Sequence, residues 1–254
     1  MTINLNTIDT LPPEWKKKKK VKKETKKLLA KIAEYQRIMY AQGKYSLLLV
    51  FQWMDAAWKD WAIKDIFTWI NPLWCAVTWF KKPTKKELSH DFLWRIHQQT
   101  PEKWMIQIFN RSHYEDILVP SVDKYIDAKT IQRRYTHINN FEQLLTDHNT
   151  HIVKIYLHTS KEEQKSRLEE RIHLPHKQWK HNDNDRESRK KWDDYRKVYH
   201  KIFKECNTIP WHIVPSDKNR WKVHQVAEIL VKTFESMKLE RPELETDVFH
   251  HHSE

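Results

Sequence analysis

Five short apolar runs alternate with longer segments of helical periodicity, and this alternation most limits the folds open to the chain. Each run is apolar or β-branched and is bounded by polar or turn residues, the pattern of a buried strand. Strands separated by helices predict an α/β fold, a five-stranded parallel sheet sandwiched by helices. The predicted strands are 46–52, 75–80, 105–109, 152–157 and 211–214, and the predicted helices are 60–69, 84–99, 112–119, 130–148, 160–173, 187–205 and 219–238.

Other segments predict additions to this sheet. Residues 20–42 predict an N-terminal helix that packs on the side. The stretch HLPHKQWKHNDNDRES is polar, basic and without apolar periodicity, which is typical of a mobile flap, so we expect a lid at about 165–190. The expected units are a basic arm at 1–29, a folded domain at 30–238 and a tail at 239–254.

Charge and cysteine content indicate the class of protein. The formal net charge is +12, and nine lysines fall within residues 1–30. The block KKKKKVKKETKK is typical of a solvated helix face or arm, although it would also attract nucleic acid, polyphosphate or an acidic membrane. The apolar run LLLVF is too short to cross a bilayer, and two cysteines do not make a disulfide framework. We therefore expect a cytoplasmic protein that is not in a membrane and favours anionic ligands.

The stretch from Trp53 to Lys59 has the spacing of a phosphate-binding loop but lacks its glycines. Such a loop follows a strand and ends in a lysine at a helix start, and its glycines let backbone N–H groups close on phosphate oxygens. The spacing G-x-x-x-x-G-K falls on Trp53, Trp58 and Lys59, and Asp60 stands where serine or threonine is usual. By itself the motif favours a structural strand-to-helix turn over phosphate binding.

Longer motifs occur in a fixed order along the chain. They are FQWMDAAWKDW, HDFLWRIH, IFNRSHYEDILV, HINNFEQLL, IVKIYLHTSKEEQKSRLEERI, KQWK, KWDDYRKVYHKIF and PWHIVPSDKNRWKVHQVAEILV. Together they resemble the family-2 polyphosphate kinases, in the branch that acts on nucleoside mono- and diphosphates, over about residues 30–238. The resemblance implies a P-loop kinase fold, like that of thymidylate kinase. It also implies magnesium-dependent phosphoryl transfer between inorganic polyphosphate and AMP, ADP, ATP or other nucleotides, and a homo-oligomer (dimer or tetramer).

Tryptophan replaces glycine systematically relative to this family. The chain has one glycine, Gly43, and 13 tryptophans, whereas a soluble domain has about 7% glycine. The family usually has a small residue at seven of the tryptophans, namely Trp53, Trp58, Trp61, Trp69, Trp74, Trp79 and Trp104. We interpret the pattern as deliberate substitution or a misreading of the sequence. Indoles at 53 and 58 would fill the phosphate space, so we expect the chain as written to bind phosphate poorly.

The resemblance also assigns site residues. A divalent cation held between phosphates needs one or two carboxylates, and an arginine suits bidentate contact with a phosphate. Catalytic roles fall on Asp55, Lys59, Arg111, Glu115 and Arg171, and Asp55 and Glu115 are the expected Mg²⁺ ligands. Nucleotide binding falls on Asp91, Arg95 and Asn110. Polyphosphate binding falls on Lys59, Lys81, Lys82, Arg167, Lys177 and Lys180.

Simpler interpretations stay open at this point. Asp55 could complement a helix dipole, Arg111 could form a structural salt bridge, and the lysines and lid arginines could be solvated. Asp91 and Arg95 are at i, i+4 and could form a surface pair. The whole chain could instead be an ATP-dependent nucleoside monophosphate kinase, or a non-catalytic module that holds nucleic acid or polyphosphate.

Overall fold

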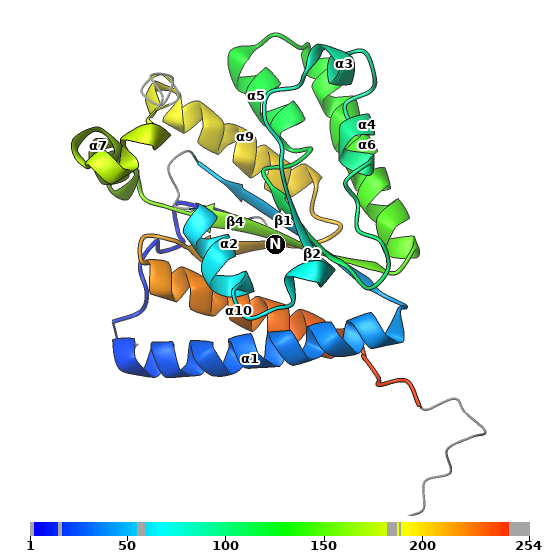
Figure 1. Cartoon of the computed structure of the whole chain (residues 1–254). Helices are drawn as coiled ribbons and strands as arrows, with labels where there is room; N and C mark the ends of the chain where they lie inside the picture. Colours follow the sequence, from blue (N-terminus) through cyan, green and yellow to red (C-terminus); the bar gives the residue numbers. More distant parts are fainter. Residues whose placement is uncertain (1–2, 15–16, 55–58, 182–186, 188, 244–254) are drawn as a thin grey trace, which may run out of the picture.

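A parallel sheet with the strand order β2-β3-β1-β4-β5 runs through the centre of the molecule (Figure 1). The structure, a computed structural model, describes residues 3–14, 17–54, 59–181, 187 and 189–243, except for the side chains of residues 59–62 and 180. All neighbouring strands are parallel, and each predicted strand agrees with an observed one to within two residues at either end. The strands are β1 (Ser46–Trp53), β2 (Cys75–Trp79), β3 (Ile106–Asn110), β4 (Thr150–His158) and β5 (Trp211–Pro215).

Helices cover both faces of this sheet, as predicted. Figure 1 shows α1 and α10 side by side on one face, with α2 above them, and α5, α6 and α9 on the other. Among the helices of the described ranges, none is long and apolar enough to span a membrane. The long helices are α1 (Lys18–Gln42), α2 (Lys59–Phe67), α5 (Glu115–Asp123), α6 (Ala128–Asp147), α7 (Lys161–His173), α9 (Trp192–Glu205) and α10 (Asn219–Ser236). The short ones are η1 (Pro72–Trp74), α3 (Lys85–Leu88), α4 (Trp94–His97) and η2 (Pro175–Lys180).

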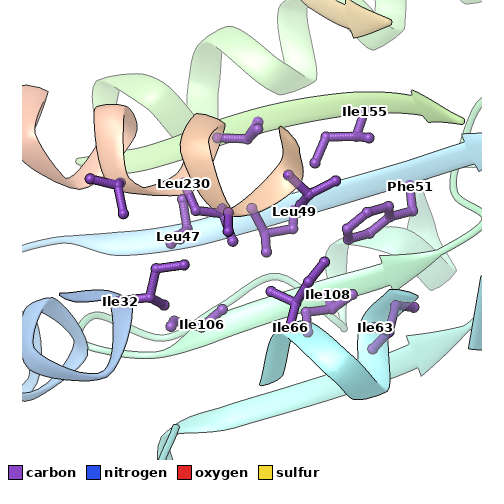
Figure 2. Packing of buried hydrophobic residues seen from close by; sticks show 14 of the residues in the cluster. Ile32, Leu47, Leu49, Phe51, Ile63, Ile66, Ile106, Ile108, Ile155 and Leu230 are labelled. Atoms are coloured by element: carbon purple, nitrogen blue, oxygen red, sulfur yellow. The ribbon is translucent and has the colours of Figure 1, made fainter. Parts of the chain in front are cut away.

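Strand β1 is buried on both of its sides, because its alternate side chains enter two different cores. Leu47, Leu49 and Phe51 pack with isoleucines of α1, α2 and β3 and with Leu230 of α10 (Figure 2). Leu48 and Val50 enter the core under α5, α6 and α9. A strand buried on both faces is expected to be continuously apolar, which explains the run LLLVF.

The N-terminal helix is present and packs on α10. α1 directs Leu29, Ile32 and Met39 into the core and ends at Gly43, whose φ of 64° lies in the left-handed region that glycine adopts easily. The helix runs across the boundary expected between residues 29 and 30. The division of the chain at that boundary stays a prediction.

The single helix predicted over 84–99 is wrong. The structure has two short helices there, α3 and α4, separated by a non-helical stretch. Thr84 and Glu87 form a capping box that starts α3. Asp91 then accepts a hydrogen bond from the N–H of Leu93 through its side chain (2.9 Å), which competes with a continuous helix. Asp91 and Arg95 therefore do not share one helix.

The strand order places a switch point at β1. β3 lies on one side of β1 and β4 lies on the other. The connection from β1 leads to β2 on one side of the sheet, whereas the connection from β3 leads to β4 on the other side. In open α/β sheets, ligands bind at the carboxyl ends of the strands beside such a point. Trp53 ends β1 and Asn110 ends β3, which locates the candidate site.

Candidate active site

The loop after β3 folds back over the end of β1. Arg111 donates its backbone N–H to the carbonyl oxygen of Phe51 (3.2 Å) and has a φ of 63°. A positive φ is uncommon for a residue with a side chain, so the surrounding contacts must hold this conformation. Ser112 supplies one such contact, because the Gln52 amide accepts from its N–H (3.2 Å) and its Oγ (2.9 Å) when the amide is oriented to satisfy both of its ends.

Arg111 and Glu115 lie together at this strand end. Arg111 Nη1 is 3.3 Å from Glu115 Oε2, and the two side chains are 32% and 13% exposed. In the same orientation of the Gln52 amide, its nitrogen donates to Glu115 Oε1 (3.0 Å). The carboxylate is thus held from both sides, while the guanidinium keeps part of its surface in solvent. The structure thus brings together Arg111 and Glu115, two of the residues that the resemblance assigns to catalysis.

A buried polar network fixes the loop from below. Lys154 Nζ donates to Glu142 Oε2 (2.7 Å), to Tyr114 Oη (3.0 Å) and to the carbonyl oxygen of Cys206 (3.0 Å). Glu142 Oε1 accepts from Tyr114 Oη (2.7 Å) and lies 3.3 Å from His113 Nε2. Burial by itself would raise the pKa of Glu142, but Lys154 and His113 lower it and the net shift is downward. His113 and Tyr114 lie between Arg111 and Glu115 in the sequence. The network that holds these two residues therefore also holds the backbone that carries Arg111 and Glu115.

Trp53 fills the space beside this pair. It is 5% exposed, and its carbonyl oxygen accepts from Tyr199 Oη (3.0 Å). The cavity left at the site measures about 40 Å³. That volume suits about one water molecule, whereas ligand pockets measure about 300–1,000 Å³. The cavity is lined by Trp53, Met54, Arg111, Glu115, Leu118, Val119, Gln164, Tyr195 and Tyr199.

The predicted phosphate-binding loop falls mostly outside the described residues. Asp55 and Trp58 are among the undescribed positions, and the side chain of Lys59 is also undescribed. The backbone of Lys59 begins α2, the helix that follows β1. A helix therefore starts directly after this loop, as a phosphate-binding loop requires.

Asn110 has an unsatisfied oxygen at the same strand end. The residue is 7% exposed, and its Oδ1 has no hydrogen-bond partner among the described residues. Mg²⁺ takes oxygen ligands and usually keeps waters and phosphate oxygens besides one or two carboxylates. The Asn110 oxygen and the Glu115 carboxylate are ligands of the kind that Mg²⁺ takes, and the two residues lie at the end of β3 and at the start of α5. The described residues contain no cluster of three or more histidine, cysteine or acidic side chains that could hold a metal by themselves.

The residues expected to bind the nucleotide are divided between two places. Arg95 is 7% exposed, pairs with Asp116 (3.0 Å) and donates to the carbonyl oxygen of Lys81 (2.8 Å). It thereby ties the segment after β2 to α5. Asp91 instead lines a separate cavity of about 930 Å³ between the α4 segment and α6. Lys81 and Lys82 are exposed beyond the end of β2.

The cations that the sequence predicts on a lid start with Arg167, in the middle of α7. Arg167 is 5% exposed, donates from Nε to Glu163 Oε1 (2.9 Å) and from Nη2 to the carbonyl oxygen of Ser216 (2.8 Å). This arginine fixes α7 to the end of β5. Arg171 is half-buried in the last turn of α7, and Lys177 Nζ lies 2.6 Å from Glu170 Oε2. The Lys180 side chain lies outside the description.

Sequence reasoning missed the aromatic and amide groups around the pair. Tyr195 and Tyr199 come from α9, Gln164 comes from α7, and Gln52 comes from β1. Tyrosines at i, i+4 on α9 could have indicated one apolar face. Nothing in the sequence indicates that this face meets the end of β1.

Comparison with known proteins decides the family. The profile of Polyphosphate kinase 2 matches residues 15–242. The AMP/ADP-polyphosphate phosphotransferase of Meiothermus ruber is 42% identical over 218 residues, which are 85% of this chain and 82% of that protein. The chain belongs to the polyphosphate kinase 2 family. An ADP-polyphosphate phosphotransferase of Rhodopseudomonas palustris is 39% identical over 84% of this chain and 78% of its own length.

Solved structures of polyphosphate kinase 2 proteins share the fold. The enzyme from Arthrobacter aurescens TC1 superposes with a TM-score of 0.93 at 37% identity, and the match covers 97% of this chain and 90% of that one. The chain is a phosphotransferase with the P-loop kinase fold of this family, so the prediction of fold and enzyme class is confirmed.

Proposed function

We propose that this protein transfers phosphoryl groups between inorganic polyphosphate and nucleoside mono- and diphosphates, converting AMP to ADP and ADP to ATP and running in both directions. The family match over residues 15–242 carries this proposal. The similarity to relatives named for AMP and ADP supports both acceptors. The position of Arg111 and Glu115 at the switch point supports it independently.

The site acts by positioning and by electrostatics. Phosphoryl transfer needs charge stabilisation and in-line placement, and it requires no covalent enzyme intermediate. The part-exposed guanidinium of Arg111 contacts the transferring phosphoryl group through two N–H donors. Bound Mg²⁺ would neutralise phosphate charge, and the oxygens of Asn110 and Glu115, with Asp55, would hold it. Gln52 keeps the Glu115 carboxylate in place.

The remaining assignments complete this proposal. Lys59 at the start of α2 neutralises the phosphate chain, and Arg171 approaches it when the lid closes. Asp91, Arg95 and Asn110 serve the nucleotide side. Lys81, Lys82, Arg167, Lys177 and Lys180 contact polyphosphate. Their positions on the β2 edge and on the lid support these roles, although Arg167 acts mainly by anchoring α7.

We further propose that the functional protein carries glycine at the seven tryptophan positions named above. The left-handed φ of 70° at Trp104 supports this, because glycine adopts that region without strain. The indole of Trp53 in the site cavity supports it too. One codon that is decoded as glycine in the cell of origin would account for all seven positions.

The intact mass of the protein from its natural source tests the glycine proposal. Seven exchanges of tryptophan for glycine lower the mass by seven equal steps, and peptide masses locate each step. A mass equal to that of the printed sequence would contradict the proposal.

Activity tests the kinase proposal in a second experiment. Glycine is restored at 53, 58 and 61, and the protein receives polyphosphate with AMP or ADP and no ATP. We expect ADP and ATP to form with Mg²⁺ present. Phosphorylation of AMP by ATP alone would favour the nucleoside monophosphate kinase, and polyphosphate binding without turnover would favour the non-catalytic module.

Two further expectations accompany this function. We propose a dimer or tetramer, which rests on the family resemblance. We propose a cytoplasmic location, which the two free cysteines, Cys75 and Cys206, support. Sedimentation of the purified protein tests the first, and cell fractionation tests the second.

A further inference from the structure

The first three turns of α1 carry an unusual density of unpaired positive charge. Residues 17–27 contain eight lysines, all exposed, and Lys20 alone has a carboxylate within 4.0 Å in the described part of the chain, namely Glu24 at 3.9 Å. Like charges at i, i+4 destabilise a helix. The segment therefore carries an electrostatic cost that a bound polyanion would remove.

Three of these lysines form one stripe. Lys18, Lys22 and Lys26 are at i, i+4 and i+8, so they lie on one face of α1 and span roughly 12 Å along it. We call them the α1 stripe. Lys18 lines a cavity of about 400 Å³, and Lys22 and Lys26 line a second of about 370 Å³. Both cavities share Asn219 and Arg220 at the start of α10, so the two cavities adjoin there, and we call them together the depression.

This depression leads to the lid. The larger cavity reaches Arg167 in the middle of α7, and Arg167 donates to the carbonyl oxygen of Ser216, which follows β5. A ligand that follows the α1 stripe therefore arrives beside the carboxyl ends of the strands. Figure 1 shows the start of α1 and α7 at the same end of the molecule.

The acids that line the two cavities are already engaged. Glu163 pairs with Arg167, and Glu170 pairs with Lys177. Asp217 accepts from the N–H of Ser160, and Asp65 accepts from the Asn219 amide. By contrast, the α1 stripe and Arg220 have no carboxylate within 4.0 Å among the described residues. Asp217 and Asp65 keep their negative charge, because their donors are neutral. The residues that line the two cavities are still net positive, with four acids against six cations, namely Lys18, Lys22, Lys26, Arg167, Lys218 and Arg220.

We propose that the α1 stripe and Arg220 form a docking track for the inorganic polyphosphate chain outside the catalytic centre. This rests on the proposed function, which supplies a linear polyanion longer than the site. Nucleic acid fits less well, because binding single strands uses aromatic side chains on which bases stack. Two tryptophans line the cavities: Trp221 is buried at 7% exposed and offers little ring surface to a base, and Trp69 is one of the positions where we propose glycine. Lysine ammoniums match a flexible row of phosphates as point charges.

The chain offers a matched control for the test. Lys19, Lys23 and Lys27 have the same spacing on the same helix, are also exposed, and do not line either cavity. The stripe variant is K18Q/K22Q/K26Q, and the control variant is K19Q/K23Q/K27Q. Both remove three charges, and glutamine keeps a helix propensity close to that of lysine. Circular dichroism confirms that each variant is folded.

Binding of long-chain polyphosphate is measured first, at several salt concentrations. We expect the stripe variant to weaken binding by about tenfold and to reduce the slope of log Kd against log salt by roughly two. The control variant should change Kd by less than about threefold, which is the effect expected from the lower net charge alone. Equal losses in both variants overturn the track. Tighter stripe-dependent binding of a single-stranded oligonucleotide than of polyphosphate also overturns it.

Kinetics of the glycine-restored protein separate the track from the catalytic site. With ADP as acceptor, the ratio of KM for long-chain polyphosphate to KM for tripolyphosphate should rise about fivefold or more in the stripe variant. It should stay unchanged in the control. An equal rise of KM for both donors would place the stripe in the catalytic site and contradict the track. If the glycine-restored protein shows no turnover but the stripe variant still binds polyphosphate more weakly than the control variant, the proposed function is contradicted and the docking track is supported.

Discussion

Lys154 Nζ lies 2.7 Å from Glu142 Oε2, and neither side chain is more than 2% exposed. The pair joins β4 to α6 and supports, through His113 and Tyr114, the loop that carries Arg111 and Glu115. Removing one member of such a pair leaves an uncompensated buried charge. The site therefore depends on a charge pair that never meets the substrate.

We predict that Glu142→Gln and Lys154→Met each lower the free energy of unfolding by about 3–5 kcal/mol. The double variant should recover part of this loss, since both charges are then absent. Chemical denaturation measures all three. Disruption of the exposed Lys197–Asp194 pair, whose atoms are 3.1 Å apart, should cost at most about 1 kcal/mol. Additive losses in the double variant would show that the pair is not coupled.

Arg111 should be needed for turnover more than for stability. Arg111→Ala in the glycine-restored protein should lower kcat by roughly 10²–10³, because a donor that stabilises transition-state charge is removed. Arg111→Lys should restore little of the lost kcat, because lysine lacks the planar pair of N–H donors that a guanidinium presents to a phosphate. Steady-state kinetics with polyphosphate and ADP give the result, with Arg37→Ala as an exposed control. An Arg111→Ala variant with normal kcat would reduce Arg111 to a structural role.

Glu115 should set the metal requirement. Glu115→Gln should raise the Mg²⁺ concentration for half-maximal rate by at least about tenfold, in the range for lost metal-site groups. A Mg²⁺ titration at saturating substrates measures the shift, and Glu102→Gln, on an exposed position, serves as the control. If the Mg²⁺ dependence stays normal while KM for the nucleotide rises, Glu115 binds the acceptor instead.

Substitution by glycine should have opposite effects on stability at Trp104 and at Trp192. Trp104 has a φ of 70° and contacts Tyr40 edge-on. Relief of about 1–3 kcal/mol of backbone strain should at least offset the ring contact, worth about 0.5–1.5 kcal/mol. Trp192 is 3% exposed in the core, so Trp192→Gly should cost about 3–5 kcal/mol or more. Thermal unfolding compares the two, and a large loss in Trp104→Gly would speak for a native tryptophan there.

Acid should destabilise the fold through buried histidines. Burial lowers the pKa of His158, and the pKa values of His151 and His212 are lowered for the same reason. A histidine whose folded pKa lies below its unfolded value of 6.5 binds fewer protons when folded. The stability it contributes is complete above pH 6.5 and falls as the pH drops below that value.

Unfolding free energies at pH 7.5, 6.5 and 5.5 test this. His158 Nε2 lies 3.2 Å from the carbonyl oxygen of Ile8, and glutamine can keep a donor there. His158→Gln should flatten the acid slope, whereas His148→Gln, at an exposed position, should leave it unchanged. A slope unaffected by His158→Gln would assign the acid sensitivity to other groups.

Local sequence patterns determined most of the architecture. The apolar runs predicted all five strands. For β1 and β3, which are buried along their whole length, the reason is that a strand covered on both faces must be apolar throughout. The prediction failed at 84–99, where the side chain of Asp91 competes for a backbone N–H. Motif order indicated the family, and the resemblance assigned Arg111 and Glu115 to one site, although the two residues share no helix, because Arg111 has a φ of 63° in the loop and α5 begins at Glu115.

Only the tertiary structure decided which distant groups meet. Gln52 of β1 reaches Glu115 at the start of α5, and Lys154 of β4 reaches Glu142 of α6. The α1 stripe faces Arg220, which lies almost two hundred residues away in the chain. Periodicity records which side of an element is buried, but not which element covers it. That choice comes from packing of the whole chain, where strand order and helix placement bring side chains into contact.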